Sequence, residues 1–130
     1  MSQGKLDAIH AGFDAFNRRD PDALASVADP TVEFDSALLG TPTYRGHDGL
    51  RQMLHDVDLA WETLRSEPGD IAVYGEVVVM TYRLSGRGRT SGAEIEGELV
   101  WLIEFRGDKV VSVREFTERD DALKAAGLEE

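Results

Sequence analysis

The sequence predicts an α+β fold in which a curved, mixed or antiparallel sheet wraps around a long N-terminal helix. Three observations carry this prediction. Two amphipathic helices and one strand come first, a third helix opens near Gly46, and long apolar segments with the character of strands follow. A sheet curved over a helix encloses space, so this order also predicts a pocket for a small molecule.

The composition predicts one domain, spanning residues 1–130. The chain is 42% hydrophobic, enough for one buried core, and it contains no cysteine, which excludes disulfides and thiolate chemistry. The first residues lack the basic flank and apolar run of a signal peptide, and no apolar stretch reaches the roughly 18 residues that a membrane span needs. We therefore expect a cytoplasmic protein without a membrane partner.

The chain is strongly acidic, with 25 Asp and Glu against 14 Lys and Arg and a net charge of -11. This charge repels the phosphates of nucleic acids and anionic lipids, so we expect no nucleic-acid partner. The ordinary role of such acidity is solubility, and the alternative is the steering of cationic ligands.

Apolar residues at helical spacing predict the helices. The first helix carries Leu6, Ile9, Phe13 and Phe16 and ends near residues 17–19. Asp20-Pro21 starts a second helix, because aspartate caps free amides and proline fits the first turn, and Asp29-Pro30 ends it. The third helix begins near His47 and presents an apolar face of Leu50, Leu54, Val57 and Trp61. A last short helix covers residues 120–126, with Gly127 as its stop.

Alternating or continuous apolar runs predict five strands, at residues 31–35, 71–74, 77–84, 95–105 and 110–116. In the first strand Val32 and Phe34 face inward. Residues 77–80 and 99–103 are apolar on both faces, so both faces of the sheet centre must be covered. The helices take one face, and a second subunit is the expected cover of the other.

Four segments carry a family resemblance: NRRDPDAL at 17–24, DPTVEF at 29–34, YRGHDG at 44–49 and FRGDKVV at 105–111. Together they resemble the nuclear transport factor 2-like superfamily, within its SnoaL-like branch. The resemblance implies a cone-shaped, cystatin-like α+β barrel with a deep pocket between the first helix and the concave sheet. It also implies a homodimer joined through the outer sheet face. It implies no single activity, because relatives include ketosteroid isomerases, polyketide cyclases, epoxide hydrolases and dehydratases.

The isomerase pattern of this superfamily does not fit the chain. That pattern has a tyrosine on the first helix, an aspartate base on the first strand and a second acid on a late strand. The matching positions here are Gly12, Phe34 and Trp101, which supply neither a base nor an oxygen donor for a dienol mechanism. Trp101 also replaces the acid of the polyketide-cyclase pattern, so neither activity transfers by resemblance.

The predicted pocket suits a flat or hydrophobic molecule, with a lining of Phe13, Phe34, Met80, Tyr82, Trp101, Ile103 and Val113. The alternative for each aromatic residue is simple core filling. Tyr82 is a candidate catalytic residue, because a buried hydroxyl needs a hydrogen-bond partner.

Glu115 is the second candidate catalytic residue. The last strand can place Val111, Val113, Glu115 and Thr117 inward, or Val110 and Phe116 instead, and only the family resemblance favours the first register. Facing inward, Glu115 is a general acid or base with a raised pKa. Facing outward, it is a solvated side chain or an ion-pair partner of Arg83 or Arg114. Glu33, Asp35 and Glu98 are weaker candidates, on the outer face or at a strand end.

The remaining motifs predict no metal and no cofactor. His10, His47 and His55 lack the spacing of a metal site. The turn at residues 85–92 has the glycines of a phosphate loop but not its lysine or its context. It reads as a mobile hairpin tip, with the alternative that its arginines form a lid over anionic substrates.

Two hypotheses of function follow. The first is an enzyme without cofactor, an isomerase, cyclase, lyase or hydrolase, in which Glu115 moves a proton and Tyr82 orients an oxygen of a hydrophobic substrate. The second is a ligand-binding or dimerisation module without catalysis. A protein-interaction adaptor is a weaker third alternative, since no partner motif is present.

Overall fold

The computed structural model describes residues 2–35 and 43–128. These residues form four helices, α1 (Ser2–Arg18), α2 (Pro21–Ser26), α3 (Gly46–Ala60) and α4 (Arg119–Ala125). They also form six strands, β1 (Ala28–Asp35), β2 (Tyr44–Arg45), β3 (Trp61–Tyr74), β4 (Val77–Gly88), β5 (Glu94–Arg106) and β6 (Lys109–Phe116). Among the described helices, none has the length and apolar character that crossing a membrane requires.

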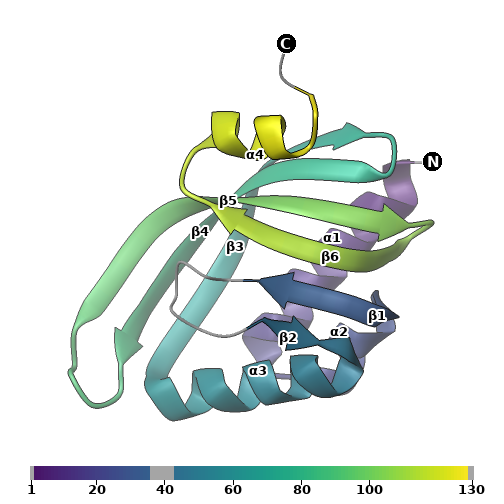
Figure 1. Cartoon of the computed structure of the whole chain (residues 1–130). Helices are drawn as coiled ribbons and strands as arrows, with labels where there is room; N and C mark the ends of the chain where they lie inside the picture. The colour runs from purple at the N-terminus through teal and green to yellow at the C-terminus, as the bar shows by residue number, and fades with distance from the viewer. Residues whose placement is uncertain (1, 36–42, 129–130) are drawn as a thin grey trace.

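The strands form one mixed sheet in the order β2-β1-β6-β5-β4-β3. β1 runs parallel to β6, and the other neighbouring strands pair antiparallel. The sheet curves around α1, and it stays open because β2 and β3 are its two free edges (Figure 1). The predicted α+β fold with a curved sheet over the N-terminal helix is confirmed.

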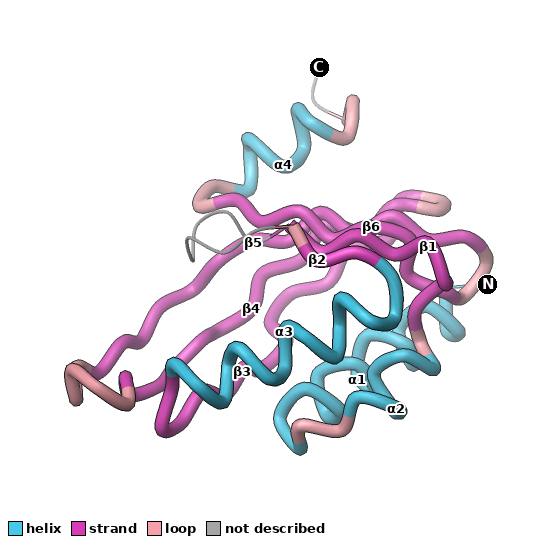
Figure 2. Tube along the Cα trace, turned by 60° about the horizontal axis from the view of Figure 1, so that its bottom comes forward, coloured by secondary structure: helices cyan, strands magenta, loops and turns pink. Residues whose placement is uncertain are grey.

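The helices divide between the two faces of the sheet. α1, α2 and α3 lie on the concave face, and α4 lies on the opposite face (Figure 2). Ile9 and Phe13 of α1 belong to the main core cluster with the inward residues of β4, β5 and β6. Leu50 and Leu54 of α3 form a second cluster with Val32 of β1. Burial of these apolar side chains positions the helices over the sheet.

α4 covers the centre of the outer face within the same chain. Its Ala122 is fully buried and clusters with Val79, Val100 and Leu102, which the sequence expected a second subunit to cover. Gly127 follows the helix with a positive φ of 74°, a conformation that glycine adopts without strain and that suits a helix stop. The homodimer through the outer face stays a prediction.

The second helix begins as predicted but ends earlier. The side chain of Asp20 accepts a hydrogen bond from the amide of Ala23 at 3.1 Å, and Pro21 opens the helix. Asp29-Pro30 does not terminate α2, because the helix already ends at Ser26. Asp29 and Pro30 lie inside β1. The pairing of β1 with β6 is irregular between Ala28 and Glu33. This irregularity accommodates Pro30, which has no amide hydrogen to give to the ladder.

The strand β3 begins ten residues earlier than predicted. Trp61 is not part of the third helix: it caps α3 and is the first residue of β3, which the sequence placed from Ile71 onward. Pro68 and Gly69 concealed the strand, since both residues weaken strands in general. They are tolerated here because β3 is an edge strand whose pairing is irregular between Pro68 and Ile71.

Candidate functional site

A cavity of about 450 Å³ lies between the helices and the concave face of the sheet. Its walls come from α1, α2, α3 and all six described strands, and they are mostly apolar. Phe13, Phe34, Trp101, Ile103 and Val113, all predicted as ligand contacts, line it. Cavities of this size and character bind small organic molecules.

Glu115 lines this cavity and contacts Tyr82 and Trp101, two other residues of the predicted lining. The hydroxyl of Tyr82 donates a hydrogen bond to Glu115 Oε1, and Trp101 Nε1 donates to the same oxygen at 3.1 Å. The second oxygen, Oε2, is buried and has no hydrogen-bond partner among the described residues. The three side chains come from neighbouring strands, and Trp101 lies directly opposite Glu115 in the ladder of β5 and β6.

The pairing of β6 with β5 is regular around Glu115 and irregular nearer the start of β6. Ile103 pairs with Val113 and Trp101 with Glu115, as the first predicted register requires. Between Glu104 and Phe105 the pairing slips by one residue, so Val110 lines the cavity as well. On one side of this irregularity Val113 and Glu115 face the cavity, as the first predicted register requires. On the other side Val110 faces it, as the second register requires.

The surroundings of Tyr82 and Glu115 raise the pKa values of both residues. Burial is the largest cause of the raised pKa of Glu115, and the carboxylate of Asp35 adds to it, while the hydrogen bonds from Tyr82 and Trp101 oppose it. Burial and the charge of Glu115 raise the pKa of the Tyr82 phenol. Tyr82 therefore remains protonated, and Glu115 is the group of this pair that titrates.

This geometry determines where a proton on Glu115 resides. Oε1 already accepts two hydrogen bonds, so protonation is favoured on Oε2, the buried oxygen that has no partner among the described residues. A protonated Oε2 can donate a hydrogen bond, and an ionised Oε2 can only accept one. A carboxyl group with this freedom and a raised pKa has the properties of a general acid or base.

The aromatic residues of the site pack against one another. The ring centroids of Tyr82 and Trp101 are 4.3 Å apart, and those of Phe34 and Trp101 are 5.5 Å apart at a nearly perpendicular angle. Phe13 also contacts Trp101, with centroids 5.2 Å apart. These contacts hold the indole and the phenol in place and thereby orient their donors toward Glu115.

Met80 was predicted to contact the ligand, and the structure corrects this. It shares the inward orientation of Tyr82 on β4, but none of its surface is exposed and it does not line the cavity. It belongs to the main core cluster with Ile9 and Ile103, whose packing covers it. Inward orientation on a strand predicts burial, and it does not distinguish the core from the cavity wall.

A second polar group on the cavity wall was not predicted. Tyr44 of β2 donates its hydroxyl to Asp56 Oδ2 at 2.7 Å, and Gln52 Nε2 donates to Oδ1 at 2.8 Å. Both Tyr44 and Asp56 line the cavity. Burial is the largest cause that raises the pKa of Tyr44 to about 12, and the hydrogen bond to Asp56 and its charge add to it. The hydrogen bonds from Tyr44 and Gln52 lower the pKa of Asp56. The sequence contains one indication of this position for Asp56. It follows the buried Met53 by three residues and therefore lies on the same, inward face of α3.

The other polar candidates lie outside the cavity. Glu33 and Glu98 are exposed, as their strand positions predicted. His47 Nε2 donates to the carbonyl of Ala28 at 2.9 Å, so this histidine has a structural role at the start of α3. Within residues 2–35 and 43–128, no group of three or more acidic and histidine side chains is arranged to hold a metal ion.

The hairpin between β4 and β5 forms one rim of the cavity, beside the end of α3. Ser91, Ala93 and Ile95 of the hairpin and Ala60 of the helix line the cavity there and are exposed. The alternative in which the arginines of this hairpin form a lid over an anionic ligand is not supported, because neither Arg87 nor Arg89 lines the cavity. Arg87 pairs with Glu94 across the hairpin instead.

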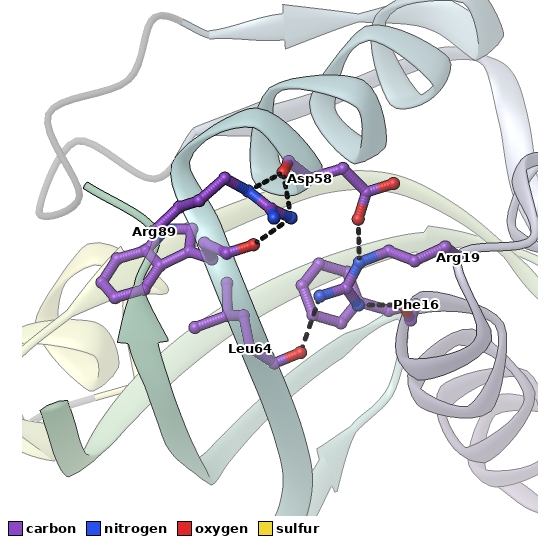
Figure 3. Close-up of polar contacts among 6 residues, drawn as sticks. Phe16, Arg19, Asp58, Leu64 and Arg89 are labelled. Atoms are coloured by element: carbon purple, nitrogen blue, oxygen red, sulfur yellow. Dashed lines mark hydrogen bonds and ion pairs between the residues drawn. The ribbon is translucent and has the colours of Figure 1, made fainter. Parts of the chain in front are cut away.

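Two arginines hold the end of α3 (Figure 3). Arg89 donates to the backbone carbonyl of Asp58 at 2.9 and 3.1 Å and to that of Trp61 at 3.1 Å. Arg19 donates to the Asp58 carboxylate at 3.1 Å and to the carbonyl of Leu64 at 2.8 Å. The free carbonyls at a helix end need such partners, and these contacts tie the hairpin and α1 to it.

Removal of the Arg89 side chain is expected to loosen this rim. Arg89→Ala loses three hydrogen bonds and should lower the free energy of unfolding by about 1 kcal/mol. Hydrogen exchange should become faster at residues 58–61. Arg87→Ala in the same hairpin is the matched control and should cost below about 0.5 kcal/mol, since it breaks only an exposed ion pair. Equal effects of the two substitutions would contradict a specific role for Arg89.

Comparison with known proteins identifies the family. Among solved structures, an NTF2-like protein from Burkholderia xenovorans is 25% identical, with a TM-score of 0.73, and 95% of each chain is covered. TerC, co-crystallised with polyporic acid, is 20% identical with a TM-score of 0.77, covering 93% of this chain and 96% of that one. A protein of ketosteroid isomerase-like fold from Catenulispora acidiphila, in complex with trimethylamine, is 16% identical with a TM-score of 0.77, covering 94% and 93%.

The similar structures support the fold, and a family model supplies the assignment. A search of the curated proteins finds no match. The model of the SnoaL-like domain matches residues 9–113, which contain the second half of α1, most of the sheet and Tyr82 and Trp101. The chain therefore belongs to the SnoaL-like domain family.

Proposed function

We propose that the protein binds a hydrophobic small molecule in the cavity and that Glu115 transfers a proton to or from it. One observation carries the proposal: Glu115 lines the cavity, two donors hold its Oε1, and its Oε2 is buried without a partner among the described residues. A buried polar atom without a partner is costly unless a ligand or water supplies one.

In the proposed reaction each residue has a role that its geometry supports. Glu115 moves the proton through Oε2. Tyr82 and Trp101 are positioning residues, since their donors face Oε1 and fix the direction of the carboxyl group. Proton transfer at carbon or oxygen in an apolar cavity is the shared step of cofactor-independent isomerases, cyclases, lyases and hydrolases, and the proposal extends to this group of reactions.

A non-catalytic ligand-binding module is the second candidate. It is favoured by Phe34 and Trp101, which occupy the two positions where the isomerase pattern of the superfamily has acids. Their rings pack edge to face within the cavity wall. An aromatic wall of this kind contributes affinity for a flat ligand and no proton transfer.

A screen that measures binding and turnover separately tests the proposal. The compounds are polyketide-like molecules, enones and epoxides, with polyporic acid added because TerC was crystallised with it. Binding is read by calorimetry and product by mass spectrometry. We expect compounds that bind to include at least one that is converted. Binding without any conversion would favour the module, and absence of binding would contradict the proposed use of the cavity.

A further inference from the structure

The charged residues that line the cavity are all acidic. Thirty residues line the cavity; among them, all within the described part of the chain, Asp56 and Glu115 are acidic and none is lysine, arginine or histidine. Asp56 is held by Tyr44 and Gln52, which are both neutral hydrogen-bond donors. The negative charge of Asp56 therefore has no ion-pair partner among the described residues.

The position of Asp56 makes this charge available to a ligand. The residue is half-buried and lies on the cavity side of α3, next to the apolar Met53 and Val57. Each of its oxygens accepts one hydrogen bond from the protein, and a carboxylate oxygen can accept a second. Because Asp56 is partly shielded from water by the apolar residues beside it, an ionic contact here is stronger than the same contact on a fully exposed surface.

The same arrangement disfavours an anionic ligand. A carboxylate or phosphate in this cavity meets Asp56 and Glu115 and finds no cationic side chain to pair with. The whole chain, with a net charge of -11, adds long-range attraction for cations and repulsion of anions. Aromatic faces such as those of Phe34 and Trp101 also accept a cation more readily than an anion.

We propose that the cavity selects an apolar molecule that carries a protonated amine, and that the ammonium group pairs with Asp56. The apolar part of the molecule then lies along the aromatic wall that leads to Glu115. This inference rests on the proposed function, because it requires that the cavity hold the ligand. It adds that Asp56, and not Glu115, determines which charge the ligand carries.

Three probes with one ring system and different charges test the inference. They are naphthylmethylamine, naphthalenemethanol and naphthoate, which are positive, neutral and negative at pH 7. Calorimetry should show that the amine binds about tenfold more tightly than the alcohol, the size expected for one half-buried ion pair. Naphthoate should bind most weakly of the three.

Two variants identify the residue responsible. Asp56→Asn keeps the shape of the side chain and should abolish the preference for the amine. Asp48→Asn makes the same change of charge at an exposed position of α3 that does not line the cavity, and it should keep the preference. Circular dichroism checks that each variant is folded. The wild-type comparison of amine and alcohol tests the inference even if Asp56→Asn fails to fold.

The outcomes separate this inference from the proposed function. If amine and alcohol bind the wild-type protein equally, or if Asp56→Asn keeps the preference, the inference is wrong while the cavity remains a ligand site. If none of the three probes binds, both the inference and the proposed use of the cavity are wrong.

Discussion

Replacement of Glu115 by glutamine is expected to lower kcat by roughly 100- to 10,000-fold for any compound that the screen shows to be converted, the range that general acid or base catalysis contributes. Glutamine has nearly the same shape, and its carbonyl oxygen can still accept from Tyr82 and Trp101. Its amide cannot exchange a proton at the position of Oε2. Binding affinity for the ligand should change much less than kcat, which calorimetry and steady-state kinetics measure separately.

Glu98→Gln is the matched control for this substitution. Glu98 is exposed on β5 and lies away from the cavity, so the same chemical change there should leave kcat unchanged. If Glu115→Gln retains the wild-type kcat, Glu115 does not transfer the proton. If Glu98→Gln loses as much activity as Glu115→Gln, the loss reflects the charge of the chain and not the site.

The pH dependence of stability gives a readout of the same variant that needs no substrate. Because burial raises the pKa of Glu115 above the ordinary value of 4.5, the folded protein binds this proton more tightly than the unfolded chain. The protonated group therefore contributes stability that is fully present below pH 4.5 and is lost as pH rises through the folded pKa. The wild-type protein should lose stability relative to Glu115→Gln over that range in urea unfolding. A difference that does not change with pH would contradict the burial of Glu115.

Met80→Ala is expected to lower the free energy of unfolding by about 2–5 kcal/mol, as truncation of a fully buried methionine does. Met80 has no exposed surface, and its side chain fills the main core cluster between α1 and the sheet. Its removal leaves a void that the surrounding side chains fill only in part. Chemical denaturation of the two proteins measures the difference.

Ligand affinity distinguishes a core residue from a ligand contact at this position. Because Met80 does not line the cavity, affinity should be unchanged under conditions where the variant is folded. Leu59→Ala is the stability control, since Leu59 is 63% exposed and its truncation should cost within about 0.5 kcal/mol. A large loss of affinity in Met80→Ala would restore the ligand contact that the sequence predicted.

The helices were predictable because local signals define them. Asp20-Pro21 is a helix start for reasons of hydrogen bonding and backbone angle that need no tertiary contact, and α2 begins there. The ends were less accurate, since the position of Asp29-Pro30 depends on pairing with β6, a strand about 80 residues away in sequence. Tertiary pairing of this kind leaves no mark in the local pattern.

The first half of β3 was not predictable from its own residues. Pro68 and Gly69 weaken a strand, and only the position of β3 at the edge of the sheet makes them acceptable. Trp61 continued the apolar spacing of α3, so its place at the start of the strand was concealed as well. Both errors arise because strand position in a sheet is set by the whole fold.

The candidate site was predictable in part. Alternation along β4 and β5 identifies Tyr82 and Trp101 as inward residues, and the family register placed Glu115 with them. The contact between Tyr44 and Asp56 joins β2 to α3, and no pattern in the sequence around either residue predicts this contact. The separation of Met80 from the cavity depends on how α1 packs, which no strand pattern contains.

A crystal structure of the protein with a bound ligand from the screen is the most direct test of whether Glu115 acts on the ligand. We expect the ligand inside the cavity, with a polar atom about 2.6–3.2 Å from Glu115 Oε2, while Tyr82 and Trp101 still donate to Oε1. A ligand bound elsewhere, or a Glu115 side chain turned away from the cavity, would contradict the proposed role of this residue.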